Sequence, residues 1–363
     1  MAAWVLLALC TGSAVFCVLA LLAVRSYKKQ PQGTPPGAVS ILKPLRGVDL
    51  GLEENLRSFF ALEGRFELVF AIQDATDPAY ALCERLIAEH PRVDARIVLT
   101  GAPEWHNAKV WQMAQAWDSL KHPQIVTSDS DIRVPKEFLK GLGSEFDVAT
   151  CPYKAVGGPS VWSALEAVGM NTEFLAGLMV ARMLEGVKFA VGPTMYVKRG
   201  VIEKIGGWQQ LSEFLAEDFV IGQRAAEKGM KVGISRQVVE HRIGSDSLTT
   251  NFKHRLRWYR STRRSRPAGY LGQLFTMPVP LAFALVLVKP EWGWLFFALL
   301  ALRLWVARSA MKLVGASASF SLLILQDMLS FAFWIAGLFG RKIEWRGRHY
   351  RLGEDGRFVR LSS

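Results

Sequence analysis

Long apolar runs mark both ends of this sequence and predict where it meets a membrane. Near the start, Trp4–Val24 holds 21 residues without a charge, enough for a helix to cross a bilayer core of roughly 30 Å. Three further apolar segments follow residue 270, at about Leu271–Val288, Trp292–Ala307 and Phe320–Leu338. A cleaved signal peptide is the weaker interpretation of the first run, because no basic region precedes it and the run is too long. The pattern predicts transmembrane α-helices, one before and about three after a central region.

The charges that flank these segments predict their orientation. Residues 25–29 include three basic side chains, so the positive-inside rule places the following region on the cytoplasmic side. Three full crossings after residue 270 would put the C-terminus on the opposite side, yet residues 341–348 are strongly basic. We therefore expect one segment to be re-entrant or interfacial, and the segment that contains Pro278 and Pro280 is the best candidate.

The central region alternates short β-type runs with longer stretches of helical periodicity. The expected strands are Val39–Lys43, Glu67–Ile72, Ala95–Leu99 and Gln124–Thr127. The expected helices include Asp77–His90 and Asn107–Leu120, in which apolar residues recur at helical spacing. Such alternation is typical of an α/β fold with a mainly parallel sheet and helices on both faces.

These patterns divide the chain into five parts. We expect an N-terminal transmembrane helix at 1–27, a soluble α/β domain at 28–250, a basic interfacial helix at 251–270, membrane segments at 271–340 and a basic tail at 341–363.

Composition narrows the classes of partner. The chain has 363 residues and a formal net charge of +12. Much of that excess flanks the apolar segments, where cytoplasmic basic residues are expected, so it does not indicate a nucleic-acid partner. The four cysteines show no paired spacing, which leaves a disulfide framework or a zinc site without support.

Acidic side chains follow two of the expected strands. Asp129 and Asp131 come directly after Gln124–Thr127, and Asp74 follows the strand that ends at Ile72. Side chains i and i+2 of an extended chain point the same way, and ligands of parallel sheets bind beyond the carboxyl ends of the strands. A divalent cation, Mg²⁺ or Mn²⁺, would relieve the repulsion between the Asp129 and Asp131 carboxylates. The alternative is a solvated turn that caps the next helix.

Glycine-rich phosphate motifs are missing after these strands. Neither G-x-G-x-x-G nor G-x-x-x-x-G-K-[ST] follows any of them, so a dinucleotide site or a P-loop loses its main support. The remaining interpretation is a nucleotide site built from carboxylates and a metal.

Two further motifs precede the C-terminal membrane segments. Glu217-Asp218 opens a stretch of helical periodicity, where an acidic pair is commonly a helix cap favoured by the helix dipole. Residues 252–266 contain seven Lys and Arg side chains and no acid. A basic aromatic helix beside a membrane is typical of a surface that binds lipid headgroups, and it can also supply cations to a departing diphosphate.

Taken in order, these motifs resemble those of the inverting family-2/21 glycosyltransferases of GT-A fold. More narrowly, they are similar to the ceramide glucosyltransferase family and its bacterial relatives that glycosylate hopanoids. The stretches that carry the resemblance are Leu42–Asp49, Gln73–Ala79, Asp129–Val134, Leu215–Asp218, Leu256–Trp258 and Trp345–Leu352. The resemblance implies a cytoplasmic GT-A catalytic domain at 28–250, in a bacterial inner membrane or a Golgi-type membrane.

The resemblance also implies roles for individual residues. Asp74 would hold the uracil and ribose side of a UDP-sugar, Asp129 and Asp131 would place Mn²⁺ or Mg²⁺ on the diphosphate, and Asp218 would be the general base. The remaining implied donor contacts are Lys109, His254, Arg257 and Trp258. His254 departs from the family pattern, which has Gln or Arg at this position before the Arg-Trp pair.

The implied reaction is transfer of glucose from UDP-glucose to the membrane lipid ceramide, with inversion at the anomeric carbon. Transfer of N-acetylglucosamine or another hexose to a hopanoid or diacylglycerol lipid stays open, because sugar specificity depends on a few hydrogen bonds. An alternative of another class is a non-enzymatic membrane-anchored module that binds lipid through residues 252–266. The expected partners are a UDP-sugar donor, a lipid acceptor and the bilayer.

Overall fold

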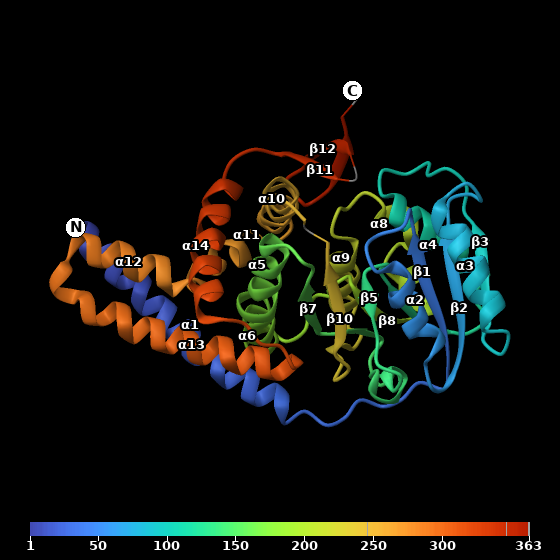
Figure 1. The fold of residues 1–363 in the computed structure, drawn as a ribbon, viewed down its shortest axis with the longest axis horizontal. Coiled ribbons are helices and arrows are strands. Elements are labelled where there is room, and N and C mark those ends of the chain that lie inside the picture. Colours follow the sequence, from blue (N-terminus) through green and yellow to red (C-terminus); the bar gives the residue numbers. More distant parts are fainter. Residues whose placement is uncertain (245, 346, 362–363) are drawn as a thin grey trace.

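A computed structural model describes residues 1–244, 246–345 and 347–361 of the chain. Arg346, in the tail stretch Trp345–Leu352, and the last two residues of the predicted tail therefore lie outside the described residues. Figure 1 shows two parts side by side, an α/β part that carries the large sheet and a helical part that includes the N-terminal helix.

Four parallel strands form one half of the large sheet, and they confirm the four predicted strands. They are β1 (Ala38–Leu45), β2 (Arg65–Ile72), β3 (Asp94–Leu99) and β4 (Gln124–Ser128). The strand order is β3-β2-β1-β4-β8-β6-β9, where β8 is Thr194–Lys198, β6 is Val148–Thr150 and β9 is Val232–Ile234. Because β8 runs antiparallel to both β4 and β6, the sheet is mixed but mainly parallel, as predicted.

Helices cover both faces of this sheet because apolar side chains alternate along its strands. On one face, Ile41 and Phe70 share a core with α2 (Leu52–Phe60) and α3 (Pro78–Glu89). On the other face, Leu42 and Val69 share a core with four helices. These are α4 (Ala108–Trp117), α7 (Arg199–Lys204), α8 (Gly207–Leu211) and α9 (Glu217–Glu227).

Two smaller sheets were not predicted. One sheet has the order β5 (Ile132–Arg133), β10 (Val239–Ile243), β7 (Tyr153–Gly157). Strand β5 directly follows Asp129–Asp131, which we call the acidic turn. The predicted tail forms the other, with β11 (Lys342–Trp345), β12 (Arg348–Leu352) and β13 (Phe358–Arg360). A short 3₁₀ turn, η1, spans Phe138–Gly141. Strands this short carry too little alternation to be recognised from sequence.

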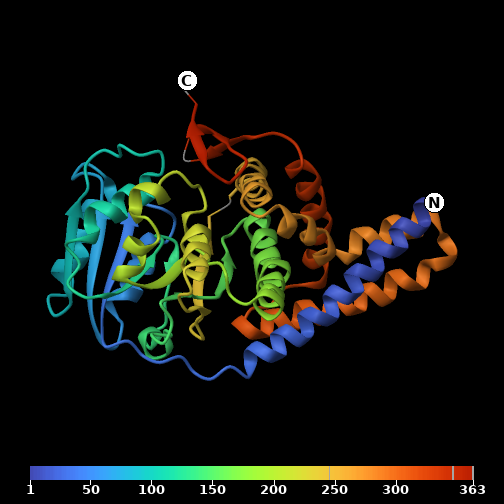
Figure 2. The same cartoon turned by 180° about the vertical axis from the view of Figure 1, so that it is seen from behind.

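Four helices among the described residues are long and apolar enough to cross a membrane. Three of them match predicted segments: α1 (Ala2–Lys28), the pair η4 (Pro290–Trp292) and α13 (Gly293–Val314), and α14 (Phe320–Gly337). Figure 2 shows α1 and α13 extending together, with α12 (Pro278–Val288) beside them, away from the α/β part.

The predicted segment at 271–288 is broken rather than straight. Its first half lies in α11 (Pro267–Gly272) and the 3₁₀ turn η3 (Gln273–Thr276), and its second half is α12. The two halves bend by 65°. Pro278 opens α12, a position where its missing N–H leaves no helical hydrogen bond unmade.

The fourth long helix was not predicted as an apolar segment. It comprises α5 (Val161–Gly169), a π-helical turn η2 (Met170–Phe174) and α6 (Leu175–Glu185), within the stretch that the sequence assigned to one soluble domain. It is less apolar than the other three helices, and more of it is buried inside the protein. The helix packs on α1 through α6 and on α14 through α5. Polar residues such as Glu166 interrupt its apolar run, so the sequence does not show one continuous apolar segment here.

One buried ion pair joins the helices of this part. Arg303 on α13 donates to Asp327 on α14 at 2.8 and 2.7 Å, and both side chains are almost fully buried. Arg303 also donates to Oγ1 of Thr172 at 3.1 Å. A charge inside an apolar helix is tolerated when a partner faces it, so Arg303 does not prevent α13 from being a membrane helix.

Candidate active site

Two of the predicted acidic positions lie at the carboxyl edge of the parallel strands. Asp74 follows β2 and Asp129 follows β4, with β1 between those strands. The ends of β2 and β4 are two strand spacings apart, which corresponds to about 10 Å. Asp74 accepts hydrogen bonds from the side chain and backbone N of Thr76 and from Gln73, and these bonds lower the pKa of Asp74. Its carboxylate is therefore ionised and fixed at the edge of the sheet.

Lys109 connects the acidic turn with the start of α9. Its Nζ lies 2.8 Å from Oδ1 of Asp129 and 3.0 Å from Oε1 of Glu217. Burial lowers the pKa of Lys109, but the charges of Asp129 and Glu217 outweigh burial and raise it overall. Asn107, the N-cap of α4, also donates to Oε2 of Glu217 at 3.3 Å. Glu217 is a site residue that the sequence analysis interpreted only as part of a helix start.

Asp131 faces a histidine from the second sheet. Nε2 of His241 on β10 lies 3.1 Å from Oδ2 of Asp131. Burial raises the pKa of Asp131, but the charge and hydrogen bond of His241, together with the charge of Lys43, lower it overall. Oδ1 of Asp131 and Nδ1 of His241 are buried without a hydrogen-bond partner among the described residues. Such atoms are costly to bury unless a ligand satisfies them.

The acidic turn itself is held by fixed contacts. Lys43 on β1 is fully buried, its Nζ donates to the carbonyl oxygen of Asp129 at 2.7 Å, and burial lowers its pKa to about 7. Ser130 donates to Oδ2 of Asp49 at 2.9 Å, and its carbonyl accepts from Asn55 at 3.1 Å. The turn leads into a strand and caps no helix, so the solvated-turn interpretation is wrong.

Asp218 lies in the first turn of α9, close to the acidic turn. A Cβ added at Gly192 would lie 2.7 Å from Oδ2 of Asp218, so the carboxylate packs directly on that backbone. The next residue, Pro193, accepts a hydrogen bond from the backbone N of Asp129 at 3.0 Å. Burial and the charge of Glu217 raise the pKa of Asp218 to about 6. A carboxylate with this pKa is largely ionised at neutral pH and still has useful affinity for a proton.

The predicted motif residues His254, Arg257 and Trp258 share one helix, α10 (Leu248–Ser265). The ring of His254 lies 4.2 Å from the ring of Trp258, centroid to centroid, and Trp258 packs against the core of the large sheet. Arg257, which lies between these two residues in the sequence, is half-buried. Nδ1 of His254 lies 2.8 Å from Oε1 of Glu166 on α5.

Tyr153 on β7 lies near the carboxylate cluster, which comprises Asp129, Asp131, Glu217 and Asp218. Its ring is 5.2 Å from that of His241, the partner of Asp131, centroid to centroid. The pKa of Tyr153 is raised by burial and then by the charges of Asp218, Glu166 and Asp131. The phenol therefore lies within electrostatic range of all three carboxylates, which come from α9, α5 and the acidic turn. The structure thus joins Lys109 to Asp129 by direct contact and places Asp218 near them. His254 contacts Glu166 on α5, and Asp74 lies farther along the sheet edge.

Much of the positive charge in residues 252–266 is engaged inside the protein. Arg260 and Arg263 donate to backbone carbonyls at the C-terminal end of α14, where the helix dipole favours cations. The other internal contacts are those of Arg255 with Gln326 and Ser330, Lys253 with Glu344, and Arg266 with Glu185. These contacts leave fewer basic side chains for lipid headgroups than the sequence suggested.

The acidic turn offers the ligand type that Mn²⁺ or Mg²⁺ prefers. Oδ1 of Asp131 has no protein partner among the described residues, and one oxygen of Asp129 is engaged by Lys109. No group of three or more His, Cys, Asp and Glu side chains within the described ranges is arranged to hold a metal. Two carboxylates fit an ion of the Mg²⁺ type, which usually takes its other ligands from phosphate and water.

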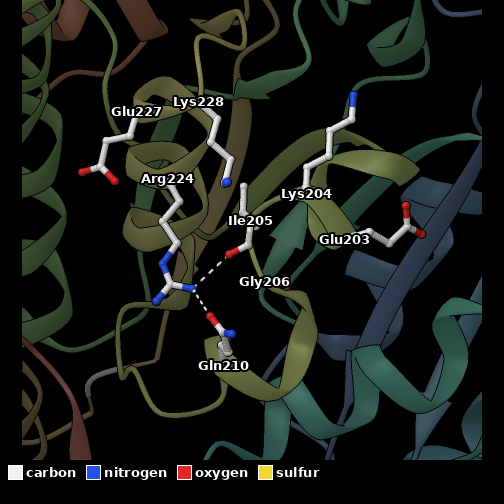
Figure 3. A pocket seen from close by; sticks show the side chains of 8 residues that line it. All are labelled: Glu203, Lys204, Ile205, Gly206, Gln210, Arg224, Glu227 and Lys228. Carbon is white, nitrogen blue, oxygen red and sulfur yellow. Dashed lines mark hydrogen bonds between the residues drawn. The ribbon is translucent and has the colours of Figure 1, made fainter.

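A surface hollow lies elsewhere on the α/β part. It has a volume of about 570 Å³ and is lined by Glu203, Lys204, Ile205, Gly206, Gln210, Arg224, Glu227 and Lys228. Figure 3 shows Arg224 reaching across to the carbonyl of Ile205 and to Gln210. Of the lining residues, Arg224, Glu227 and Lys228 lie about 9–15 Å along α9 from Asp218, at or just beyond its C-terminal end. The others come from α7, from α8 and from the turn between them. The hollow is therefore separate from the carboxylate cluster.

The fold is shared with a solved glycosyltransferase. The structure titled mannosyltransferase PcManGT from Pyrobaculum calidifontis in complex with GDP-Man and Mn²⁺ superposes with a TM-score of 0.53 at 15% identity. The match covers 93% of this chain and 98% of that chain. An identity this low shows the fold alone. The chain therefore has the GT-A type of glycosyltransferase fold, combined with apolar helices long enough to span a membrane.

Sequence comparison then gives the family. The family model described as "Glycosyl transferase family 21" matches residues 5–358, so the chain belongs to glycosyl transferase family 21. Ceramide glucosyltransferases 1 and 3 of Caenorhabditis elegans are 28% and 26% identical to it over 240 residues, which is 64% of this chain. The chain spans about half the length of these curated relatives, 51% and 52%. The predicted resemblance to the ceramide glucosyltransferase family is confirmed.

Proposed function

We propose that this protein is a membrane-bound inverting glycosyltransferase that moves glucose from UDP-glucose to a hydroxyl group of ceramide. The observation that carries the proposal is the position of Asp218, a carboxylate with a raised pKa beside Lys109 and the acidic turn. Membership of glycosyl transferase family 21 and the relatives named ceramide glucosyltransferases support the choice of acceptor.

Asp218 serves as the general base in the proposed reaction. Its carboxylate accepts the proton of the acceptor hydroxyl while the hydroxyl oxygen forms a bond to the anomeric carbon of glucose. The bond between that carbon and the β-phosphate oxygen breaks, and UDP leaves with the electron pair. Because attack and departure occur on opposite faces, the anomeric configuration is inverted.

The other site residues bind and orient the donor. Asp74 holds the uracil and ribose, and His254, Arg257 and Trp258 of α10 close over the diphosphate. Asp129 and Asp131 would hold Mn²⁺ or Mg²⁺, which when bound neutralises charge on the departing diphosphate. Lys109 balances the charges of Asp129 and Glu217, so that these carboxylates do not raise the pKa of Asp218 still further.

The membrane setting follows from the helices. We propose that 28–250 is the catalytic domain and that it lies on the cytoplasmic side, where residues 25–29 supply flanking positive charge. An acceptor lipid reaches the site from the helical part, because α5 and α10 carry residues of the site and also pack on α14. The internal use of many basic side chains of α10 weighs against a non-enzymatic lipid-binding module.

A panel of radiolabelled UDP-sugars and lipid acceptors tests the proposal. Purified protein should transfer label from UDP-glucose to ceramide in the presence of Mn²⁺ or Mg²⁺. Label on a hopanoid or diacylglycerol but not on ceramide would show that the acceptor is wrong, and preference for UDP-N-acetylglucosamine would show that the sugar is wrong. Consumption of no UDP-sugar at all would contradict the enzymatic function.

A further inference from the structure

We propose that Glu166 is a positioning residue for His254, and that it holds the imidazole ring so that Nε2 faces the diphosphate of the donor. This inference rests on the proposed use of a UDP-sugar. Glu166 comes from α5, which the sequence analysis did not connect with the site, and His254 comes from α10.

The contacts between the two helices are specific. The Glu166 side chain is only 1% exposed, and its Oε1 lies 2.8 Å from Nδ1 of His254, whose side chain is 30% exposed. Its Oε2 accepts a hydrogen bond from Asn251 at 2.8 Å. Asn251 and His254 are three residues apart and so lie on the same face of α10. Each carboxylate oxygen of Glu166 therefore engages a different residue on that face.

Burial explains why this pairing restrains the ring. An ionised carboxylate removed from water is tolerated only when charges or donors face it, and the 2.8 Å contact between Oε1 of Glu166 and Nδ1 holds that edge of the His254 ring against α5. The hydrogen-bonding state of one imidazole nitrogen decides which role the other can take. Contact with the Trp258 ring, 4.2 Å away between centroids, limits rotation from a second direction. The ring edge that carries Nε2 is then the one left to meet a ligand.

The location of the pair connects it with the donor site. Tyr153 lies within electrostatic range of Glu166, Asp218 and Asp131. His241, the partner of Asp131, is also influenced by the charge of Glu166. In the fold, α5, which carries Glu166, packs on β7 and β10, the strands that carry Tyr153 and His241. The rings of Tyr153 and His241 lie 5.2 Å apart, centroid to centroid, so the helix that carries the Glu166 side of the Glu166–His254 pair packs beside the donor site.

The attachment of α10 to the helical part does not rest on Glu166 alone. Arg255 already fixes α10 to α14 through hydrogen bonds to Gln326 at 3.0 Å and to Ser330 at 2.8 Å. Nearby in the π-helical turn, Glu173 accepts from Ser330 at 2.8 Å and lies 3.4 Å from the hydroxyl of Tyr259. Glu173 is a second carboxylate on the same long helix that does not contact His254, so Glu173→Gln is a matched control.

A double-mutant cycle on UDP affinity tests the proposal. We expect Glu166→Gln and His254→Gln each to weaken UDP binding by about 10-fold or more, the usual effect of removing an outer partner of a functional histidine. The double variant should bind UDP as His254→Gln does, within about twofold. Uridine, which has no phosphate, should bind all variants like the wild type. Glu173→Gln should keep wild-type UDP affinity.

Three results would overturn the proposal: losses that multiply in the double variant, an unchanged UDP affinity in Glu166→Gln, or an equal loss for uridine. Thermal unfolding checks that each variant is folded. If Glu166→Gln does not fold, Glu166→Asp replaces it, because aspartate keeps the charge on a shorter side chain. UDP binding requires neither ceramide nor turnover. If the protein binds UDP but does not transfer glucose to ceramide, the proposed function is contradicted and the double-mutant cycle can still be measured. If the wild type binds no UDP, both the proposed function and the role of Glu166 are contradicted.

Discussion

Replacing Asp218 by Asn should stabilise the protein while it removes the activity. Burial and the charge of Glu217 raise the pKa of Asp218 from 3.8 to about 6. At about 1.4 kcal/mol per pKa unit, the ionised carboxylate costs the folded state about 3 kcal/mol at neutral pH. Asp218 is partly exposed, so screening by solvent makes this value an upper limit. A neutral amide of the same shape avoids this cost.

The sign of the pH dependence follows from the same shift. Because the pKa of Asp218 is higher in the folded than in the unfolded protein, the folded state binds more protons between about pH 4 and pH 6. The contribution of Asp218 to the free energy of unfolding is therefore least favourable above pH 6 and improves as the pH falls through that window. Asp218→Asn should remove this contribution. Turnover by the wild type should fall as the pH drops below about 6, because the base becomes protonated.

The assay compares thermal unfolding and transfer rate in detergent micelles. Asp218→Asn should unfold at a higher temperature than the wild type at pH 7.5, keep its UDP affinity, and lose about 100-fold to 10,000-fold in turnover. Asp147→Asn is a control of opposite sign, because hydrogen bonds from Lys231 and Lys198 outweigh burial and lower the pKa of Asp147. That variant should be less stable than the wild type. Equal stability and undiminished turnover in Asp218→Asn would refute the reasoning.

Three single variants and one double variant test the contacts that support the site and the helical part. Lys109→Met should lower the free energy of unfolding by about 3–5 kcal/mol, because it leaves buried negative charge without its cation; an unchanged unfolding temperature would argue against that ion pair. Leu215→Ala should cost about 2–5 kcal/mol in an unfolding experiment, because Leu215 packs in the core of the C-terminal sheet, and a wild-type value would mean that the tail sheet does not pack there. Arg303→Met alone should destabilise by about 3–5 kcal/mol, whereas Arg303→Met combined with Asp327→Leu should recover most of the loss; equal losses in the single and double variants would contradict the pairing.

The strands and the acidic turn could be predicted because their signals are local. Each parallel strand is a short apolar run bounded by turn residues, and the acidic turn follows β4 immediately in sequence. Lys109 was implied as a donor contact only by the family resemblance, and its contact with Asp129 was not predicted. Glu217 could not be distinguished from an ordinary acidic residue in the first turn of a helix, because the partner that reveals its role, Lys109, is far away in the chain.

The contribution of α5 and α6 could not be predicted for a related reason. Glu166 and Glu173 lower the mean hydropathy of this long helix, and their partners on α10 and α14 are distant in sequence. The basic residues 252–266 suggested a surface for lipid headgroups, but hydrogen bonds to the end of α14 use several of them. In each case the role of a polar side chain depends on a partner that is distant in sequence, and no local sequence pattern indicates that partner.

The anomeric configuration of the product is the most direct measurement of whether one displacement, with Asp218 as base, takes place at this site. UDP-glucose carries an α-linked sugar, so NMR of the glycolipid formed from UDP-glucose and ceramide should show a β linkage. An α-linked product, or the absence of any glycolipid from protein that binds UDP, would contradict the inverting mechanism.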